Sequence, residues 1–134
     1  MADEIPWERL FEEATRVRER AHVPYSRFPV GAAILYADGS VMAGCNVENA
    51  TYGLTVCAER NAFAAGVAQG RSQPVAVAVV ANTDTPVPPC GMCRQVMAEF
   101  GPPQLQVRSR TPRGDEMRYS LGELLPHAFT KDFL

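Results

Sequence analysis

The chain has 134 residues, of which 46% are hydrophobic and 21% are charged, and its formal net charge at pH 7 is -2. This length suits one domain with a buried core, and the composition excludes a fibrous or disordered chain. The slight acidic balance argues against general binding of polyanions such as nucleic acids, which normally requires a basic excess. No internal repeat or linker divides the sequence, so we expect residues 1–134 to form a single domain.

The first half of the chain predicts a helix, a strand hairpin and a second helix. Apolar residues recur at helical spacing over residues 6–21. Two apolar strands, over residues 30–36 and 41–47, flank the turn signal of residues 37–40. Another helix is expected over residues 57–69, with Gly70 suited to its C-terminal end.

The second half predicts alternating strands and helices. Residues 75–81 are continuously apolar, as in a strand buried on both faces. A helix over about residues 90–100 stops at the Gly-Pro-Pro of residues 101–103. Two short strands and a short helix follow, at residues 105–107, 117–119 and 121–125. This order predicts an α/β fold, with a single mixed sheet of about five strands and helices on both faces.

The N-terminus and the cysteines predict where the protein is found. Residues 1–5 are acidic and lack the apolar segment of a secretory signal, and the longest apolar run, residues 75–81, is too short to span a bilayer. Four cysteines in a chain without a signal indicate reduced thiols rather than a disulfide framework. We therefore expect a cytoplasmic protein that does not enter a membrane.

Three of the cysteines have the spacing of metal ligands. Cys90 and Cys93 are three residues apart and share one face of the expected helix, while Cys57 begins a different helix. The positive end of each helix favours thiolate over thiol. Three thiolates suit Zn²⁺ and leave its fourth position for water, as in a hydrolytic site.

Glu59 is the candidate proton carrier beside this metal. Two residues along an ideal helix correspond to about 200° of rotation, so Glu59 and Cys57 converge only if the helix begins very close to Cys57. Three thiolates also make the zinc cluster anionic and a weaker Lewis acid. Arg60, three residues after Cys57, and Arg94, directly after Cys93, are therefore expected to donate hydrogen bonds to thiolate sulfur.

Other interpretations of these cysteines stay open at this point. A CxxC pair alone also occurs in redox sites, although a redox site would not need Cys57 or Glu59. A structural zinc site would need a fourth Cys or His. Cys45 is the spare cysteine and is expected as a small core residue, while His22 and His127 are not expected to be ligands.

Four blocks of the sequence resemble the small cytidine deaminase family and follow its order over nearly the whole chain. They are PYSRFPVGAA at residues 24–33, GCNVENATYGLTVCAER at residues 44–60, PCGMCRQ at residues 89–95 and ELLPHAF at residues 123–129. One departure is Pro88, where many relatives carry Ser. The resemblance implies a cytidine deaminase-like α/β/α sandwich with one Zn²⁺ per subunit, held by Cys57, Cys90 and Cys93, and Glu59 as the catalytic residue.

The resemblance also implies how a nucleoside would be bound. Asn46 and Glu48 would bind the ribose hydroxyls, and their alternation along an extended segment puts both side chains on one side. Phe28 would pack against the pyrimidine, and the backbone N–H of Ala58 would orient it. Phe129 would reach the site of a neighbouring subunit.

The implied assembly is a homotetramer, in which Tyr25 and Tyr52 lie at subunit contacts. The implied reaction is zinc-dependent hydrolysis of cytidine and 2′-deoxycytidine to uridine and 2′-deoxyuridine with release of ammonia, a reaction of pyrimidine salvage. The alternatives are a deaminase of a nucleoside-like antibiotic, a polynucleotide cytosine deaminase, and a non-enzymatic zinc module.

Overall fold

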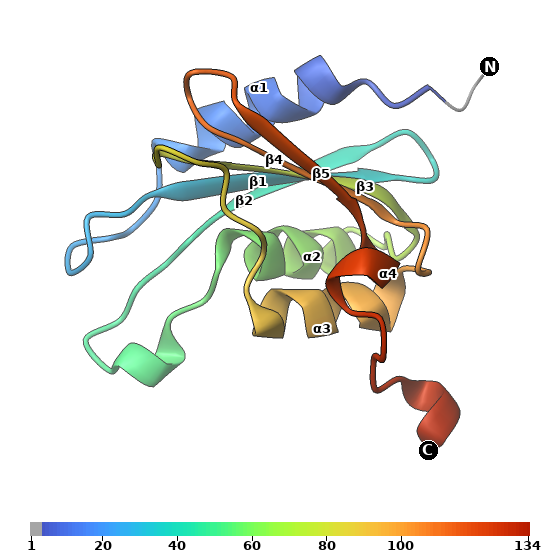
Figure 1. Cartoon of the computed structure of the whole chain (residues 1–134). Helices are drawn as coiled ribbons and strands as arrows, with labels where there is room; N and C mark the ends of the chain where they lie inside the picture. Colours follow the sequence, from blue (N-terminus) through green and yellow to red (C-terminus); the bar gives the residue numbers. More distant parts are fainter. Residues whose placement is uncertain (1–3) are drawn as a thin grey trace.

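Five strands form one mixed sheet in the order β2-β1-β3-β4-β5 in the computed structural model, which describes residues 4–134 (Figure 1). β1 is antiparallel to β2 and β3, β3 is parallel to β4, and β4 is antiparallel to β5. The strands are β1 (Val30–Tyr36), β2 (Val41–Cys45), β3 (Pro74–Ala81), β4 (Gln106–Arg110) and β5 (Glu116–Ser120).

Helices cover both faces of this sheet. Figure 1 shows α1 on one face and α2, α3 and α4 on the other. Their bounds are α1 (Trp7–Arg18), α2 (Ala58–Ala68), α3 (Gly91–Phe100) and α4 (Leu121–Leu124), with short 3₁₀ turns at η1 (Tyr52–Leu54) and η2 (Lys131–Phe133).

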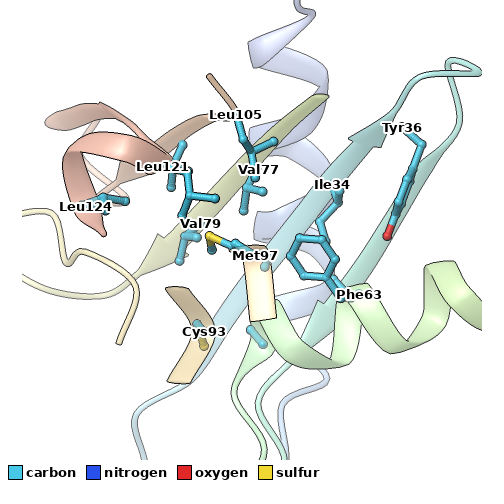
Figure 2. Close-up of a cluster of buried hydrophobic side chains, with 14 residues drawn as sticks. Ile34, Tyr36, Phe63, Val77, Val79, Cys93, Met97, Leu105, Leu121 and Leu124 are labelled. Carbon is cyan, nitrogen blue, oxygen red and sulfur yellow. The ribbon is translucent and has the colours of Figure 1, made fainter. Parts of the chain in front are cut away.

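The two faces carry separate hydrophobic clusters because side chains alternate along each strand. On the α1 face, Leu10 and Phe11 pack against small residues of the sheet such as Ala33 and Ala78. On the opposite face, the cluster is formed by residues of β1, β3, β4 and three helices (Figure 2). Figure 2 shows Phe63 of α2 and Met97 of α3 directed at this side of the sheet, with Cys93 on the same helix as Met97. The start of α3 is therefore anchored in the core.

Gly44 lets α2 lie directly on β2. A Cβ atom at Gly44 would collide with the carbonyl oxygen of Ala58 and the backbone nitrogen of Ala62. The close approach fixes the first turn of α2, and with it Cys57, against the sheet.

The predicted fold class and the predicted helices and strands are confirmed, with shifts at their ends. The first helix ends at Arg18 rather than residue 21, and the second strand ends at Cys45 rather than residue 47. The strand stops early because Val47 leaves β2 and forms isolated bridges with His22 and Val56. The two 3₁₀ turns were not predicted.

Two expectations concern the chain outside the sheet. The acidic segment of residues 1–5 lies partly outside the described residues, since the structure describes the chain from residue 4. Within residues 4–134, no helix is long and apolar enough to cross a membrane.

Candidate active site

The three predicted thiols meet at the N-terminal ends of two helices. Cys57 is the residue before α2 and Cys90 the residue before α3, and both have extended backbone angles. The Sγ atom of Cys90 is 3.7 Å from that of Cys57 and 3.4 Å from that of Cys93, and all three ligand atoms lie within 4.8 Å of one another. Tetrahedral zinc with Zn–S bonds of about 2.3 Å separates its sulfurs by about 3.8 Å. The donor set and its spacing therefore fit Zn²⁺.

The close sulfur atoms shift the pKa values of Cys57 and Cys93 in opposite directions. The pKa of Cys57 is lowered to about 5, first because the Cys93 thiol donates a hydrogen bond to it and further because of Cys90 and Arg60. The same contact raises the pKa of Cys93, because Cys93 must keep its proton to donate it. The lowered pKa of Cys57 favours the thiolate form that metal binding requires.

Glu59 lies in the first turn of α2, as its predicted role requires. The helix begins at Ala58, directly after Cys57, so the condition for Cys57 and Glu59 to converge is fulfilled. Glu59 is only 5% exposed, and burial raises its pKa to about 7, with the nearby Cys57 adding to the shift. A carboxyl group with a pKa near neutrality can take up and release a proton at working pH.

The two arginines differ in what they hold. Arg60 faces Cys57 closely enough to lower the pKa of that thiol, and its Nη2 donates to the carbonyl oxygen of Thr55 at 3.0 Å. Arg94 instead donates to the carbonyl oxygens of Pro89 and Leu124, both at 2.8 Å. The expected hydrogen bond from Arg94 to sulfur is therefore corrected: this guanidinium fixes the backbone before Cys90, because two carbonyl groups lie within its reach.

A cavity of about 190 Å³ opens in front of the thiols. Glu59, Cys57 and Cys90 line it together with three residues predicted to bind substrate, namely Phe28, Asn46 and Ala58. Its other walls are mostly apolar and were not predicted: Val30, Thr55, Val79, Ala81, Val87 and Pro88. A small, mostly apolar cavity with a few polar groups beside a titratable carboxyl group is a typical place for a flat polar ring.

Asn46 connects the cavity wall to the sheet. Its Oδ1 accepts a hydrogen bond from the backbone N–H of Val30, and its Nδ2 donates to the carbonyl oxygen of Phe28, both at 2.9 Å. One side chain thus fixes the backbone on both sides of residue 29. Phe28 is 37% exposed, and its backbone is held by Asn46 and by a hydrogen bond from its N–H to Oγ of Ser26 at 3.0 Å.

Glu48 does not line the same cavity. It lies in an adjoining depression of about 300 Å³, lined also by Tyr25, Ser26, Tyr52 and Thr55. Its Oε1 accepts hydrogen bonds from the backbone N–H groups of Tyr25 (3.0 Å) and Ser26 (3.2 Å). Hydrogen bonds from Ser26 are the first cause that holds the pKa of Glu48 below its usual value. Thr55 lines both the cavity and the depression, together called the two hollows below, and no prediction from the sequence included it.

The residues predicted at subunit contacts lie on the surface. The rings of Tyr25 and Tyr52 meet edge to face at 5.9 Å between centroids. Phe129 is 60% exposed, stacks on Phe133 at 5.6 Å, and does not line the cavity of its own chain. The structure therefore groups the thiols, Glu59, Phe28, Asn46 and Ala58, with Glu48 beside them and the exposed aromatic residues apart.

Comparisons with known proteins agree with this geometry. The family profile described as "Cytidine and deoxycytidylate deaminase zinc-binding region" matches residues 6–109. A cytidine deaminase of Halalkalibacterium halodurans is 55% identical over 123 residues, which cover 92% of this chain and 93% of the relative. One of Sporosarcina psychrophila is 49% identical over 127 residues, which cover 95% and 93%. The crystal structure of cytidine deaminase from Burkholderia pseudomallei has a TM-score of 0.90 at 49% identity, covering 93% of this chain and 100% of that chain.

The matched region contains the whole metal cluster. Cys57, Glu59 and the Cys90/Cys93 pair all fall within residues 6–109. The predicted zinc cofactor is confirmed by the zinc-binding profile and by the clustered thiols that fit this ion. The chain belongs to the cytidine and deoxycytidylate deaminase family.

Proposed function

We propose that this protein hydrolyses cytidine and 2′-deoxycytidine to uridine and 2′-deoxyuridine with release of ammonia, in pyrimidine salvage. The observation that carries the proposal is the buried carboxyl group of Glu59, which lines one small cavity with Cys57 and Cys90. Relatives that are 49–55% identical over nearly the whole chain are cytidine deaminases, which supports the choice of substrate.

Cys57, Cys90 and Cys93 would hold the Zn²⁺ ion. When bound, the ion acts as a Lewis acid that lowers the pKa of a water molecule from about 15.7 toward about 7. The two helix N-termini and Arg60 offset part of the negative charge of the thiolates.

Glu59 would carry the protons of the reaction. Its carboxylate takes a proton from the attacking water and delivers it to ring N3, which makes C4 of the pyrimidine electrophilic. The water oxygen bonds to C4 as a hydroxyl group, Glu59 transfers the remaining proton of this hydroxyl to the amino group, and the C4–N bond then breaks. Ammonia leaves, and a carbonyl oxygen stands where the amino group was. The pKa of Glu59, near 7, suits both the uptake and the release of a proton.

The walls of the cavity would orient the nucleoside. The ring of Phe28 would stack on the pyrimidine, and the backbone N–H of Ala58, at the positive end of α2, would donate to a polar atom of the base. Asn46 and Glu48 would bind the sugar hydroxyls. Asn46 lines the cavity and Glu48 the adjoining depression, so a nucleoside held by both would extend from one hollow into the other.

The assembly we propose is a homotetramer of single-domain subunits covering residues 1–134. Its support is the set of exposed aromatic side chains that a soluble monomer would not need: Tyr25, Tyr52 and Phe129 are 51%, 75% and 60% exposed. Phe129 would complete the cavity of a neighbouring subunit. A cytoplasmic location belongs to the same proposal, and four free cysteines support it.

The test is incubation of the purified, zinc-loaded protein with four substrates while deamination is followed. Cytidine and 2′-deoxycytidine should be converted, and single-stranded DNA and a nucleoside-like antibiotic such as blasticidin S should not. Turnover confined to the DNA would replace the proposal with a polynucleotide deaminase, and turnover confined to the antibiotic with a resistance enzyme. Zinc without any turnover would leave a non-enzymatic zinc module.

A further inference from the structure

Two extended segments in front of the cavity form a small two-stranded pairing. Val47 and Val56 exchange both of their backbone hydrogen bonds, each at 2.9 Å, as an antiparallel bridge. In such a bridge the flanking residues face one another as non-hydrogen-bonded pairs, whose side chains are closest, with Cβ atoms about 4.5–5.5 Å apart. Asn46 therefore lies opposite Cys57, and Glu48 opposite Thr55.

The two hollows follow this pairing. Side chains alternate along each segment, so both pairs point to the same side, away from the side chains of Val47 and Val56. Asn46 and Cys57 line the cavity, whereas Glu48 and Thr55 line the depression. Thr55 also lines the cavity, so it stands where the two hollows meet.

The backbone of Thr55 is fixed while its hydroxyl group is free. Its N–H donates to the carbonyl oxygen of Tyr52 at 3.1 Å, and its own carbonyl oxygen accepts from Arg60 at 3.0 Å. Within residues 4–134, Oγ1 of Thr55 has no hydrogen-bond partner, yet it is not among the buried atoms that lack one. The hydroxyl group is therefore open to the space between the two hollows.

We propose that Thr55 is a specificity-determining residue that binds a sugar hydroxyl of the nucleoside together with Glu48. The inference rests on the proposed function, because it assumes that the base occupies the cavity beside Glu59. A sugar hydroxyl both donates and accepts. The carboxylate of Glu48 can only accept, and the hydroxyl of Thr55 can donate, so the pair complements such a group.

The test compares Thr55→Val with the wild type on cytidine and on its 2′-deoxy, 3′-deoxy and 5′-deoxy analogues. Valine keeps the shape and removes the hydroxyl. We expect KM for cytidine to rise roughly 2- to 10-fold with little change in kcat, as for one lost hydrogen bond to substrate. The increase in KM caused by Thr55→Val should vanish for the one analogue that lacks the sugar hydroxyl bound by Thr55. Thr55→Ser should restore wild-type KM.

Zinc content and melting temperature show that the variants are folded, and Thr51→Val is the matched control. Thr51 is an exposed threonine of the same segment that lines neither hollow and whose side chain caps nothing. Its replacement should leave KM within about twofold.

Three results would overturn the role of Thr55 alone while the wild type deaminates cytidine. They are an unchanged KM in Thr55→Val, an equal penalty on all three deoxy analogues, and failure of Thr55→Ser to restore KM. A wild type without turnover on any nucleoside would instead overturn the proposed function, and this inference with it.

Discussion

The metal side and the sugar side of the site are built in different ways. The metal side consists of Cys57, Glu59, Cys90 and Cys93, at the starts of two helices that pack on the sheet. The second group, called the sugar side because Asn46, Glu48 and Thr55 are proposed to bind the sugar, also includes Phe28. It lies on loops joined by isolated bridges and side-chain hydrogen bonds. Glu59 and Cys93 are 5% and 1% exposed, whereas Phe28 is 37% exposed.

This difference predicts how substitutions on each side affect folding, zinc binding and substrate binding. The metal side depends on core packing, so a changed ligand should disturb both metal binding and folding. The sugar side depends on a few hydrogen bonds, each with a net contribution of about 0.5–1.5 kcal/mol to stability. Its variants should fold and hold zinc, but bind substrate less well.

The largest expected effect is that of Cys90→Ser. Loss of this ligand should release the zinc, abolish deamination and lower the free energy of unfolding by about 3–4 kcal/mol, since a ligand present at 100 to 1,000 times its Kd stabilises by that amount. Metal analysis and thermal unfolding measure these effects. Cys45→Ser is the control, because Cys45 is free and lies outside the thiol cluster. A Cys90→Ser variant that keeps stoichiometric zinc would refute the ligand set.

Glu59→Gln should separate chemistry from metal binding. The amide keeps the size of the side chain but cannot carry a proton, so kcat should fall by at least about 10²- to 10⁴-fold while zinc content stays at the wild-type level. Steady-state kinetics with metal analysis check both. Glu99→Gln, an exposed change on α3, should have neither effect. Near-normal turnover in Glu59→Gln would remove Glu59 from the mechanism.

Asn46→Asp tests the sugar side. The carboxylate would face the carbonyl oxygen of Phe28 without a proton to donate, which breaks one of the two hydrogen bonds that Asn46 makes to the backbone of Phe28 and Val30. We expect kcat/KM for cytidine to fall about 10-fold or more, because an unpaired polar group near the cavity costs about 1–3 kcal/mol. Zinc content should not change. Loss of zinc in this variant would mean that the two sides are not independent.

The same contrast explains which parts of the site the sequence predicts. A CxxC pair and a Cys-x-Glu sequence at helix starts are local patterns: the spacing of Cys90 and Cys93 places both on one face of α3, and the start of α2 at Ala58 lets Glu59 lie near Cys57. The meeting of the two helix starts depends on the packing of α2 against α3. Thr55 is the counterexample. Its position opposite Glu48 depends on the bridge between Val47 and Val56, which joins segments that have no strong strand pattern. The sequence signal was the two-residue spacing from Thr55 to Cys57, which is meaningful only once that segment is known to be extended.

Arg94 marks a second limit of prediction from sequence. Its place next to Cys93 suggested a hydrogen bond to sulfur, but its guanidinium reaches the carbonyl oxygen of Leu124, which is 30 residues away in the chain. The partner comes from the packing of α4 beside α3, and no local pattern reports that packing. The proposed homotetramer is harder still to predict from the sequence, because only the exposure of Tyr25, Tyr52 and Phe129 bears on it.

The smallest effect should come from Arg94→Lys. Lysine keeps the charge but lacks the fork that donates to Pro89 and Leu124 at once, so one carbonyl oxygen loses its partner. We expect the free energy of unfolding to fall by about 1–2 kcal/mol, with zinc retained at saturating metal and kcat changed less than that of Glu59→Gln. Arg16→Lys is the control, since Arg16 forms an exposed pair with Glu13 that should contribute less than about 1 kcal/mol. A large loss of kcat with unchanged stability would instead mean that Arg94 acts on the thiolates, as its sequence position first suggested. An effect on stability alone would mean that Arg94 stabilises the backbone that positions the metal ligands. The residues that support the metal side would then include Pro89 and Leu124 of α4.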